Sequence, residues 1–493
     1  MAKTIIIDPI TRIEGHLKIE VNVDKGKVVD AKSSGTLWRG FERILIGRDP
    51  RDPVILTQRI CGVCPTGHAM ASVQCIDDAF DVVPPENARI IRNLIQGANY
   101  IQSHVLHFYH LAALDYVKGP DAPPFIPRYE GDYRFSKELN DELVKHYVKA
   151  LEIRLKAHEL LAVFGGKMPH SSSIVAGGVS CVPDVDRIAD FFWRLNELRD
   201  FIDNFYLPDV IKVAETYSDY FSIGIGCKNL LSYGVFDLDS KPDVKERKRL
   251  LSMGRYTDGM IGDVDPKKIT EDVKHSWYSS KSNLHPSKGE TEPDPQKSDA
   301  YSWLKSPRYD GKVHEVGPLA RMAIAHLTKV NATVSKLIED TLSHFKADIS
   351  ALFSVLGRHA ARALECKFVA DEMAKWVLEI KPDKPVYNEP KIPDKANGMG
   401  LWEPPRGALG HWMEVRDKKI SRYQCVVPTT WNASPRDDKD QPGPIEQALI
   451  GAPVPDTENP FSVVRIVRSF DPCIACAVHI IEKDRIPKVF EVC

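Results

Sequence analysis

Two pairs of cysteines, each pair separated by two residues, are the side chains in this sequence best suited to metal chemistry. Cys61 and Cys64 form the first pair, and Cys473 and Cys476 form the second. This spacing lets both thiolates of a pair reach one metal ion from a single turn of chain. Thiolates are soft ligands that favour zinc, copper(I) and iron–sulfur centres. A histidine follows each pair closely and can supply a ligand or a hydrogen bond.

The two pairs lie near opposite ends of the 493-residue chain. Structural zinc sites usually place their two cysteine pairs about 15–20 residues apart. A site that closes only after nearly the whole chain has folded is poorly suited to stabilising the fold, but it suits an active centre. We therefore favour a redox metal centre, and a zinc-stabilised interaction protein is the alternative.

The cysteine pairs lie in two distinctive segments, RICGVCPTGH at 59–68 and DPCIACAVH at 471–479. These segments resemble the two signature motifs of the large subunit of nickel–iron hydrogenases. The resemblance runs from one end of the chain to the other, since the family is also matched by DPITRIEGHLKIEV, WRGFE, HSSSIVAGGV, YSWLKSPRYDGK, EVGPLAR, PRGALGHW and VVPTTWN.

The resemblance implies reversible oxidation of molecular hydrogen at a thiolate-bridged nickel–iron centre whose iron carries carbon monoxide and cyanide. By similarity all four cysteines should bind nickel. Cys64 and Cys476 should also bridge to iron, and Cys61 and Cys473 should be terminal ligands. Metal-bound sulfur is polarisable and can accept a proton, so Cys473 is expected to act in catalysis. Some relatives in the nickel–iron–selenium group carry selenocysteine at this position, and Cys473 could stand for that residue.

Two further residues resemble catalytic groups of the family. Glu14, in RIEGH, matches the first proton carrier of the family. A carboxylate can fill this role, because its pKa rises on partial burial and it can then relay protons. Its alternative role is a structural ion pair with Arg12. Arg406 follows Pro405 in PRG and looks like the residue that overhangs the iron, where its guanidinium would donate hydrogen bonds to cyanide.

Several residues are expected to surround the centre by the same resemblance. His68 should hydrogen-bond a bridging sulfur, and Asp471 should orient Arg406. Thr429 and the backbone around Pro428 should hold the other diatomic ligands.

One position departs from the family. Many members carry an aspartate where this sequence has Ser103, so the hydrogen-bond network around the arginine is expected to be less acidic. The neighbouring His104, His107 and His110 recur every three residues and are candidates only for an interface or for contacts behind the metal ligands.

A second, structural metal site is also implied by the resemblance. Its ligands would be Glu42 in WRGFE, the backbone carbonyl of Cys425 and the imidazole of His479. Magnesium is the usual metal in the family, but it prefers oxygen ligands, so iron is the alternative.

Hydrophobic periodicity predicts an α-rich α+β fold, and the resemblance predicts the hydrogenase large-subunit fold, with a central bundle of long helices and both chain ends meeting at the buried metal site. Residues 4–32 alternate as strands around a turn at Gly26. Helices are expected over 86–117, 136–164, 186–216 and 317–356, the last continuing after Gly357 to about 380.

Other segments lack regular periodicity. We expect 275–315 to be a long ordered loop or lid, and the proline- and glycine-rich 380–462 to be irregular chain over the helices. Residues 1–479 would form a single domain. The tail 480–493 contains no ligand set, and in related large subunits such a tail is removed by a maturation endopeptidase after nickel insertion.

The composition narrows the partners. Net charge is −2, which argues against nucleic acid binding. We expect no signal peptide and no membrane span. No further cysteine cluster could carry electrons away, so a partner is needed. The resemblance implies that this partner is an iron–sulfur small subunit, which in the respiratory members of the family carries the large subunit across the membrane to the periplasm. A cytoplasmic hydrogenase and a nickel-free relative in a quinone-linked respiratory complex are alternatives.

Overall fold

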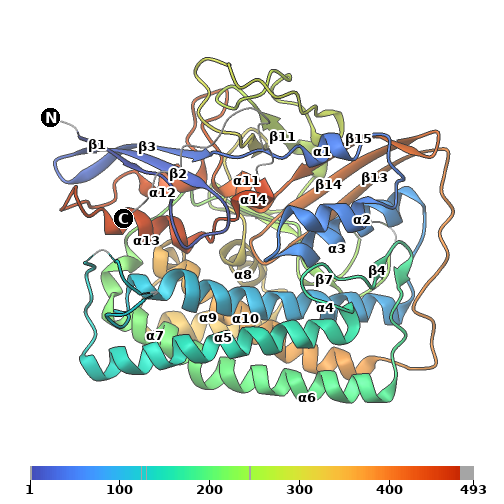
Figure 1. The fold of residues 1–493 in the computed structure, drawn as a ribbon, viewed down its shortest axis with the longest axis horizontal. Coiled ribbons are helices and arrows are strands. Elements are labelled where there is room, and N and C mark those ends of the chain that lie inside the picture. Colours follow the sequence, from blue (N-terminus) through green and yellow to red (C-terminus); the bar gives the residue numbers. More distant parts are fainter. Residues whose placement is uncertain (1–2, 124, 129, 242, 244–245, 478–493) are drawn as a thin grey trace.

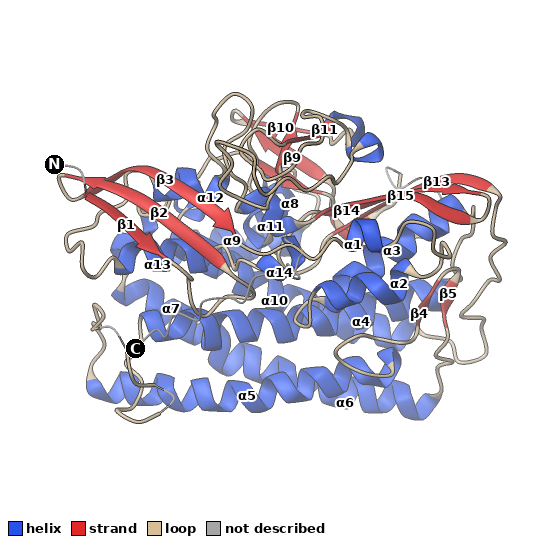
Figure 2. Ribbon diagram, turned by 45° about the horizontal axis from the view of Figure 1, so that its top comes forward, coloured by secondary structure: helices blue, strands red, loops and turns tan. Residues whose placement is uncertain are grey.

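The structure is a computed structural model that describes residues 3–123, 125–128, 130–241, 243 and 246–477. Its long helices form a lower layer, and the N-terminal sheet and a sheet within residues 395–426 lie above opposite ends of that layer (Figures 1 and 2). Among the described residues, no helix combines the length and the apolar character needed to cross a membrane.

The helical layer is built around α4 (Glu86–Val105), which begins directly after Pro85. Every residue of α4 after Glu86 is buried, because α5 and α10 pack against it. The predicted helix to 117 continues beyond α4 as a wider π-helical turn, Leu106–Ala112, and a short 3-10 turn, Ala113–Asp115. The other long helices of the layer are α5 (Lys137–Gly165), α6 (Val185–Phe201), α7 (Leu207–Thr216) and α10 (Val355–Glu379).

The predicted continuous helix over 317–356 is wrong. The chain forms α8 (Pro318–Leu327), α9 (Ala332–His344) and a short 3-10 helix before α10 begins. Lys329 adopts a left-handed backbone conformation, φ 53°, that ends the first helical run. Asn331 then caps α9 by accepting a hydrogen bond from Val334 N, and Ser354 caps α10 in the same way from Gly357 N.

The N-terminal sheet is antiparallel in the order β1 (Lys3–Ile7), β2 (Leu17–Asp24), β3 (Lys27–Gly35). Along β2, buried residues alternate with half-buried ones, so one face of the sheet packs on the core. Lys25 and Gly26 both have positive φ and form the predicted hairpin turn.

The prediction of irregular chain over 380–462 is also wrong, because this region contains a three-stranded antiparallel sheet. Its strands are β13 (Lys395–Trp402), β14 (Leu409–Arg416) and β15 (Lys419–Val426). The glycines that hid the strand pattern serve packing against α3 (Pro65–Ala79). A Cβ on Gly400 would lie 2.0 Å from the carbonyl oxygen of Ala71, and one on Gly398 would lie 2.1 Å from that of Cys75.

The remaining elements are short. The segment expected as a long ordered loop, 275–315, contains one short strand, β12, and is held to the body by backbone hydrogen bonds. The short strands are β4 (Ile174–Val175), β5 (Gly178–Val179), β6 (Leu230–Ser232), β7 (Val235–Asp237), β8 (Arg249–Leu251), β9 (Gly254–Thr257), β10 (Met260–Gly262), β11 (Ile269–Asp272) and β12 (Ser306–Tyr309). The short helices are α1 (Phe41–Ile44), α2 (Pro53–Leu56), α11 (Pro428–Asn432), α12 (Pro444–Leu449), α13 (Phe461–Ser469) and α14 (Ile474–Ala477).

The two end regions of the chain meet through backbone hydrogen bonds. Glu14 N donates to the carbonyl oxygen of Pro472 at 3.3 Å, and Ile474 N donates to that of Glu14 at 2.7 Å. Gly15 permits this approach, since its φ is +83° and a Cβ there would lie 2.6 Å from Ala475 N. The segment after β1 therefore holds the second cysteine pair in place.

Candidate metal centre

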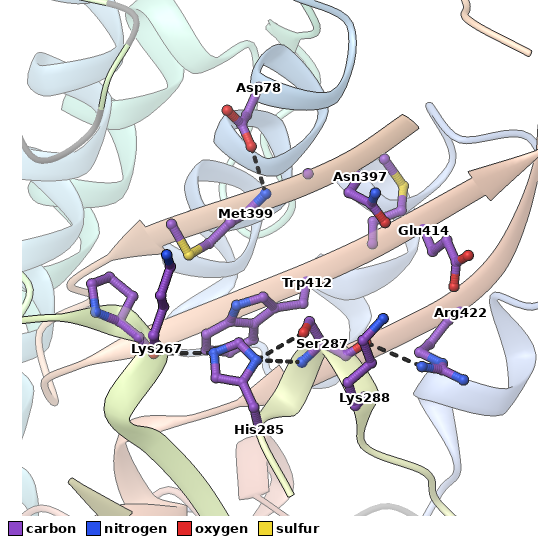
Figure 3. Close-up of a pocket in the computed structure, with 13 residues that line it drawn as sticks. Asp78, Lys267, His285, Ser287, Lys288, Asn397, Met399, Trp412, Glu414 and Arg422 are labelled. Atoms are coloured by element: carbon purple, nitrogen blue, oxygen red, sulfur yellow. Dashed lines mark hydrogen bonds between the residues drawn. The ribbon is translucent and has the colours of Figure 1, made fainter. Parts of the chain in front are cut away.

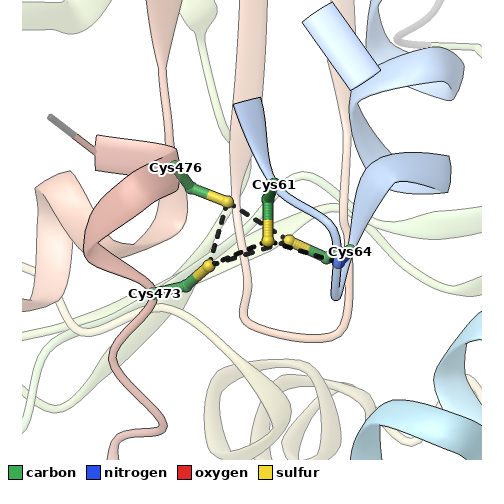
Figure 4. A group of neighbouring side chains, drawn as sticks. All are labelled: Cys61, Cys64, Cys473 and Cys476. Carbon is green, nitrogen blue, oxygen red and sulfur yellow. Dashed lines mark hydrogen bonds between the residues drawn. The ribbon is translucent and has the colours of Figure 1, made fainter. Parts of the chain in front are cut away.

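Four sulfur atoms from the two ends of the chain form one buried cluster (Figure 4). All lie within 4.8 Å of one another. The Sγ–Sγ distances are 3.3 Å for Cys61–Cys473, 3.2 Å for Cys64–Cys476 and 3.0 Å for Cys473–Cys476. These separations are too long for disulfides and fit ligands that surround a common ion.

The first cysteine pair lies between a 3-10 turn and a helix. Cys61 follows the turn Thr57–Ile60, and Cys64 is the residue before α3, whose first residue is Pro65. The backbone N–H groups of Val63 and Cys64 point at the sulfur of Cys61, 3.3 and 3.4 Å away. Such donors stabilise a thiolate.

The second pair is fixed by the N-terminal segment and by α11. Thr429 Oγ1 accepts a hydrogen bond from Cys473 N at 3.0 Å. Glu14 Oε2 accepts one from Ala475 N at 3.0 Å and lies 3.1 Å from the sulfur of Cys473. Burial, followed by the nearby charge of Cys61, raises the pKa of Glu14 to about 7. This carboxyl group can therefore carry a proton near neutral pH.

The chemistry of the sulfur cluster fits a bound metal. Burial raises the pKa of Cys473 and Cys476 well above the usual value of a thiol; the neighbouring sulfurs add to the rise at Cys473, whereas at Cys476 the hydrogen bond with Cys473 opposes it. Burial also opposes ionisation of Cys61, but hydrogen bonds from the other three thiols and the charge of Arg406 hold its pKa well below that value. A thiophilic metal ion would offset the cost of ionising the buried thiols and would hold all four sulfurs as thiolates.

Arg406 is buried near this cluster, with only 3% of its surface exposed, and the charges of the cluster cysteines act on its guanidinium. Its Nε donates to the carbonyl oxygen of Asp471 at 3.0 Å, and its Nη2 donates to Asp471 Oδ1 at 2.9 Å. Its Nη1 is buried and has no hydrogen-bond partner within the part of the chain that the structure describes. A buried donor needs an acceptor, so the arrangement fits an anionic group beside the sulfurs.

The other predicted residues show mixed outcomes. Arg12 pairs with Asp115, so the alternative of an ion pair between Arg12 and Glu14 is wrong. The hydrogen bond that the structure gives the His68 ring joins its Nδ1 to His411 Nε2 at 3.4 Å, whereas we had expected a sulfur partner. The Oγ of Ser103 is buried without a partner among the described residues.

The three neighbouring histidines do not form one surface. The rings of His104 and His107 are buried and bond Glu365 Oε2 and the carbonyl oxygen of Arg468, so an interface role for these two is wrong. His110 is half-buried and bonds the carbonyl oxygen of Tyr147. His107 and His110 lie in the π-helical turn, whose wider winding points them in other directions than continued α-helix would.

Two members of the predicted second metal site lie side by side. Glu42 Oε1 accepts a hydrogen bond from Cys425 N at 3.0 Å, and Thr291 donates to Glu42 Oε2. The third predicted ligand, His479, lies outside the described residues, as does the predicted tail 480–493. Sequence reasoning missed Lys305, whose buried ammonium group donates to Gln424 Oε1 at 3.0 Å beside this pair.

Sequence reasoning also missed Arg39. Its guanidinium donates to the carbonyl oxygens of Ile60 and of Ala475, the latter at 2.7 Å, and so joins the chain beside both cysteine pairs. Arg39 lies inside the matched segment WRGFE, and this position was the one available signal.

A pocket of about 460 Å³ lies elsewhere, on the face of β13 and β14 (Figure 3). Its lining includes Lys267, His285 and Trp412, and none of the four cysteines. The metal chemistry is therefore separate from this pocket.

The fold brings both chain ends together at a buried sulfur cluster that fits the binding of a thiophilic metal. A family model described as nickel-dependent hydrogenase matches residues 39–123 and 117–479, and one described as HoxL-like matches 4–34. The chain belongs to the family of nickel-dependent hydrogenase large subunits, as the sequence motifs predicted. It is the catalytic subunit for hydrogen oxidation at a nickel–iron centre.

Named relatives agree over nearly the whole length. The chain is 48% identical to the periplasmic [NiFeSe] hydrogenase large subunit of Desulfomicrobium baculatum, covering 97% of this chain and 95% of the relative. It is 36% identical to the hydrogenase-2 large chain of Escherichia coli, covering 98% of each. These likenesses do not favour the zinc-stabilised or nickel-free alternatives.

Solved structures agree with the fold. An H2-activated [NiFeSe] hydrogenase of Dm. baculatum superposes with a TM-score of 0.92 at 48% identity, covering 97% of this chain and 100% of that one. The reduced Ni-Fe-Se hydrogenase of D. vulgaris Hildenborough gives a TM-score of 0.93 at 46% identity, with the same coverage.

Proposed function

We propose that Cys61, Cys64, Cys473 and Cys476 hold the nickel of the hydrogenase centre, with Cys64 and Cys476 shared with the iron. The single observation that carries this proposal is the buried cluster of four sulfurs within 4.8 Å of one another. When bound, the centre supplies the splitting of hydrogen into protons and electrons.

Glu14 receives the proton in this proposal. Its Oε2 lies 3.1 Å from the sulfur of Cys473, within reach for direct transfer. The backbone of Ala475 holds the same oxygen, which keeps the carboxyl group facing the sulfur.

Arg406, oriented by Asp471, would supply positive charge and its unpaired Nη1 donor to the carbon monoxide and cyanide ligands of a bound iron. Thr429 and the backbone at Pro428 would hold the other diatomic ligands, and Ser103, Pro405 and His68 would contribute to the surroundings of the centre. Glu42 and Cys425, together with His479, would hold a magnesium or iron ion.

An iron–sulfur small subunit would remove the electrons, since the large-subunit relatives imply such a partner and the four clustered cysteines are already used. We infer that the heterodimer is exported to the periplasm with that subunit, in line with the periplasmic relative. Nickel-insertion proteins and an endopeptidase that cleaves after His479 would complete maturation.

Metal analysis and infrared spectroscopy of the purified enzyme test this assignment. We expect nickel and iron together with cyanide and carbonyl stretches. Zinc without such stretches would contradict it.

A further inference from the structure

A buried arginine on α8 contacts the chain immediately before Arg406. Arg321 has no exposed surface. Its Nε and Nη2 donate to the two carboxylate oxygens of Glu365 on α10, at 2.6 and 2.7 Å. Its Nη1 donates to Glu403 Oε2 at 2.7 Å. One guanidinium thus joins α8, α10 and the end of β13.

The same guanidinium also binds the backbone of the turn that carries Arg406, residues 404–407. Nη1 donates to the carbonyl oxygen of Pro404 at 3.2 Å, and Nη2 donates to that of Pro405 at 2.8 Å. Prolines have no backbone N–H and so cannot anchor this segment through one of their own. These bonds therefore fix the two residues that precede Arg406.

The two carboxylates are themselves held in place. His104 Nε2 lies 2.9 Å from Glu365 Oε2, and Tyr233 N donates to Glu403 Oε1 at 2.7 Å. The hydroxyl of Tyr100 donates to the carbonyl oxygen of Glu403 at 2.6 Å. A network in which each member is bonded is rigid, so a displacement of Arg321 would pass to the turn.

The other side of the turn rests on the start of α8. Gly407 N donates to the carbonyl oxygen of Pro404 at 3.0 Å and closes the turn. Gly407 has φ +129°, and a Cβ there would lie 2.6 Å from Gly317 N. The turn is therefore enclosed between Gly317, which precedes α8, and the guanidinium of Arg321, which lies one helical turn further along α8.

We propose that Arg321 is a positioning residue that sets the distance between the Arg406 guanidinium and the metal centre, through the carbonyl groups of Pro404 and Pro405. The proposal rests on the proposed function of Arg406. Lysine at 321 would keep the charge but could not bond two carboxylates and two carbonyls at once, because it lacks the planar array of donors.

The test uses the purified, metal-loaded heterodimer with R321K, R406K and R308K. Arg308 is an equally buried arginine whose Nε bonds Asp437 Oδ2 at 2.7 Å, and none of its hydrogen bonds within the described residues reaches the turn, so R308K controls for loss of a buried arginine. Infrared bands of the diatomic ligands, and kcat and KM for hydrogen per bound nickel, are measured for each.

We expect R321K to shift the infrared bands in the direction seen for R406K, by a smaller amount, and to lower kcat by up to about 100-fold, as small misplacements do. KM should change little, and R308K should keep wild-type bands. If R321K assembles no nickel, E403Q, which weakens the same network, takes its place, and we expect its infrared bands to shift in the same direction.

Wild-type bands and kcat in assembled R321K, or in E403Q where R321K fails to assemble, would overturn the positioning role. Equal shifts in R321K and R308K would also overturn it. If R406K itself leaves the bands unchanged, the proposed function of Arg406 fails instead.

Discussion

Gly15→Ala tests whether the contact between the two ends of the chain assembles the metal centre. Gly15 has φ +83°, where a side chain is disfavoured by about 1–2 kcal/mol. The new Cβ would lie 2.6 Å from Ala475 N and 2.9 Å from Ile474 Cβ, so these residues must move. Inserting a methyl group into such a packed contact costs about 1–3 kcal/mol more.

The displaced residues lie between Cys473 and Cys476, so we expect G15A to lose bound nickel and hydrogen uptake as well as stability. Gly47→Ala is the matched control, because Gly47 has φ +81° with no atom within 4 Å of its added Cβ. Nickel per protein by elemental analysis, thermal unfolding and hydrogen uptake are compared. Equal nickel content and equal melting temperatures for G15A and G47A would refute this reasoning.

Three further predictions concern Glu14, Glu365 and the end of the chain. Glu14→Gln should keep nickel bound but lower turnover on the order of 100-fold. The control Glu20→Gln should leave turnover unchanged. Unchanged turnover in both variants would show that the proton path does not pass through Glu14. Despite burial, Arg321 holds the pKa of Glu365 at about 2, against 4.5 ordinarily, which corresponds to about 3 kcal/mol of stability. This stabilisation is present above pH 4.5 and is lost as pH falls toward 2. The difference in melting temperature between wild type and Glu365→Gln should therefore narrow over that range. A constant difference would argue against a depressed pKa of Glu365. Intact-mass measurement of active enzyme should show a chain ending at His479, and active enzyme that retains the tail would contradict cleavage.

The fold class and the family could be predicted from the sequence because both are carried by local signals. The cysteine spacing marks a metal site without reference to the fold. The hairpin around Gly26 and the helices over 136–164 and 186–216 have clear periodicity, and the structure contains these elements.

The errors have physical causes. Glycines in β13 read as loop residues, but Gly398 and Gly400 are required by the close approach of the α3 backbone, which only tertiary structure reveals. The break before α9 did carry a local signal, the capping Asn331, which apolar periodicity on both sides concealed.

Within the site, residues in recognisable motifs could be named, but their partners could not. Arg39 joins both cysteine pairs through backbone carbonyl groups, and Arg321 binds the turn before Arg406 in the same way. Carbonyl acceptors exist at every residue, so the sequence carries no mark of which ones an arginine will reach.

The most direct test of the central claim is the nickel content of single cysteine variants. C64S and C476S each remove one sulfur from the cluster, while C366S makes the same change at a buried cysteine in α10 outside it. The account predicts that C64S and C476S lose nickel and hydrogen uptake, and that C366S retains both. Near-normal nickel in either cluster variant, or nickel loss in C366S alone, would contradict it.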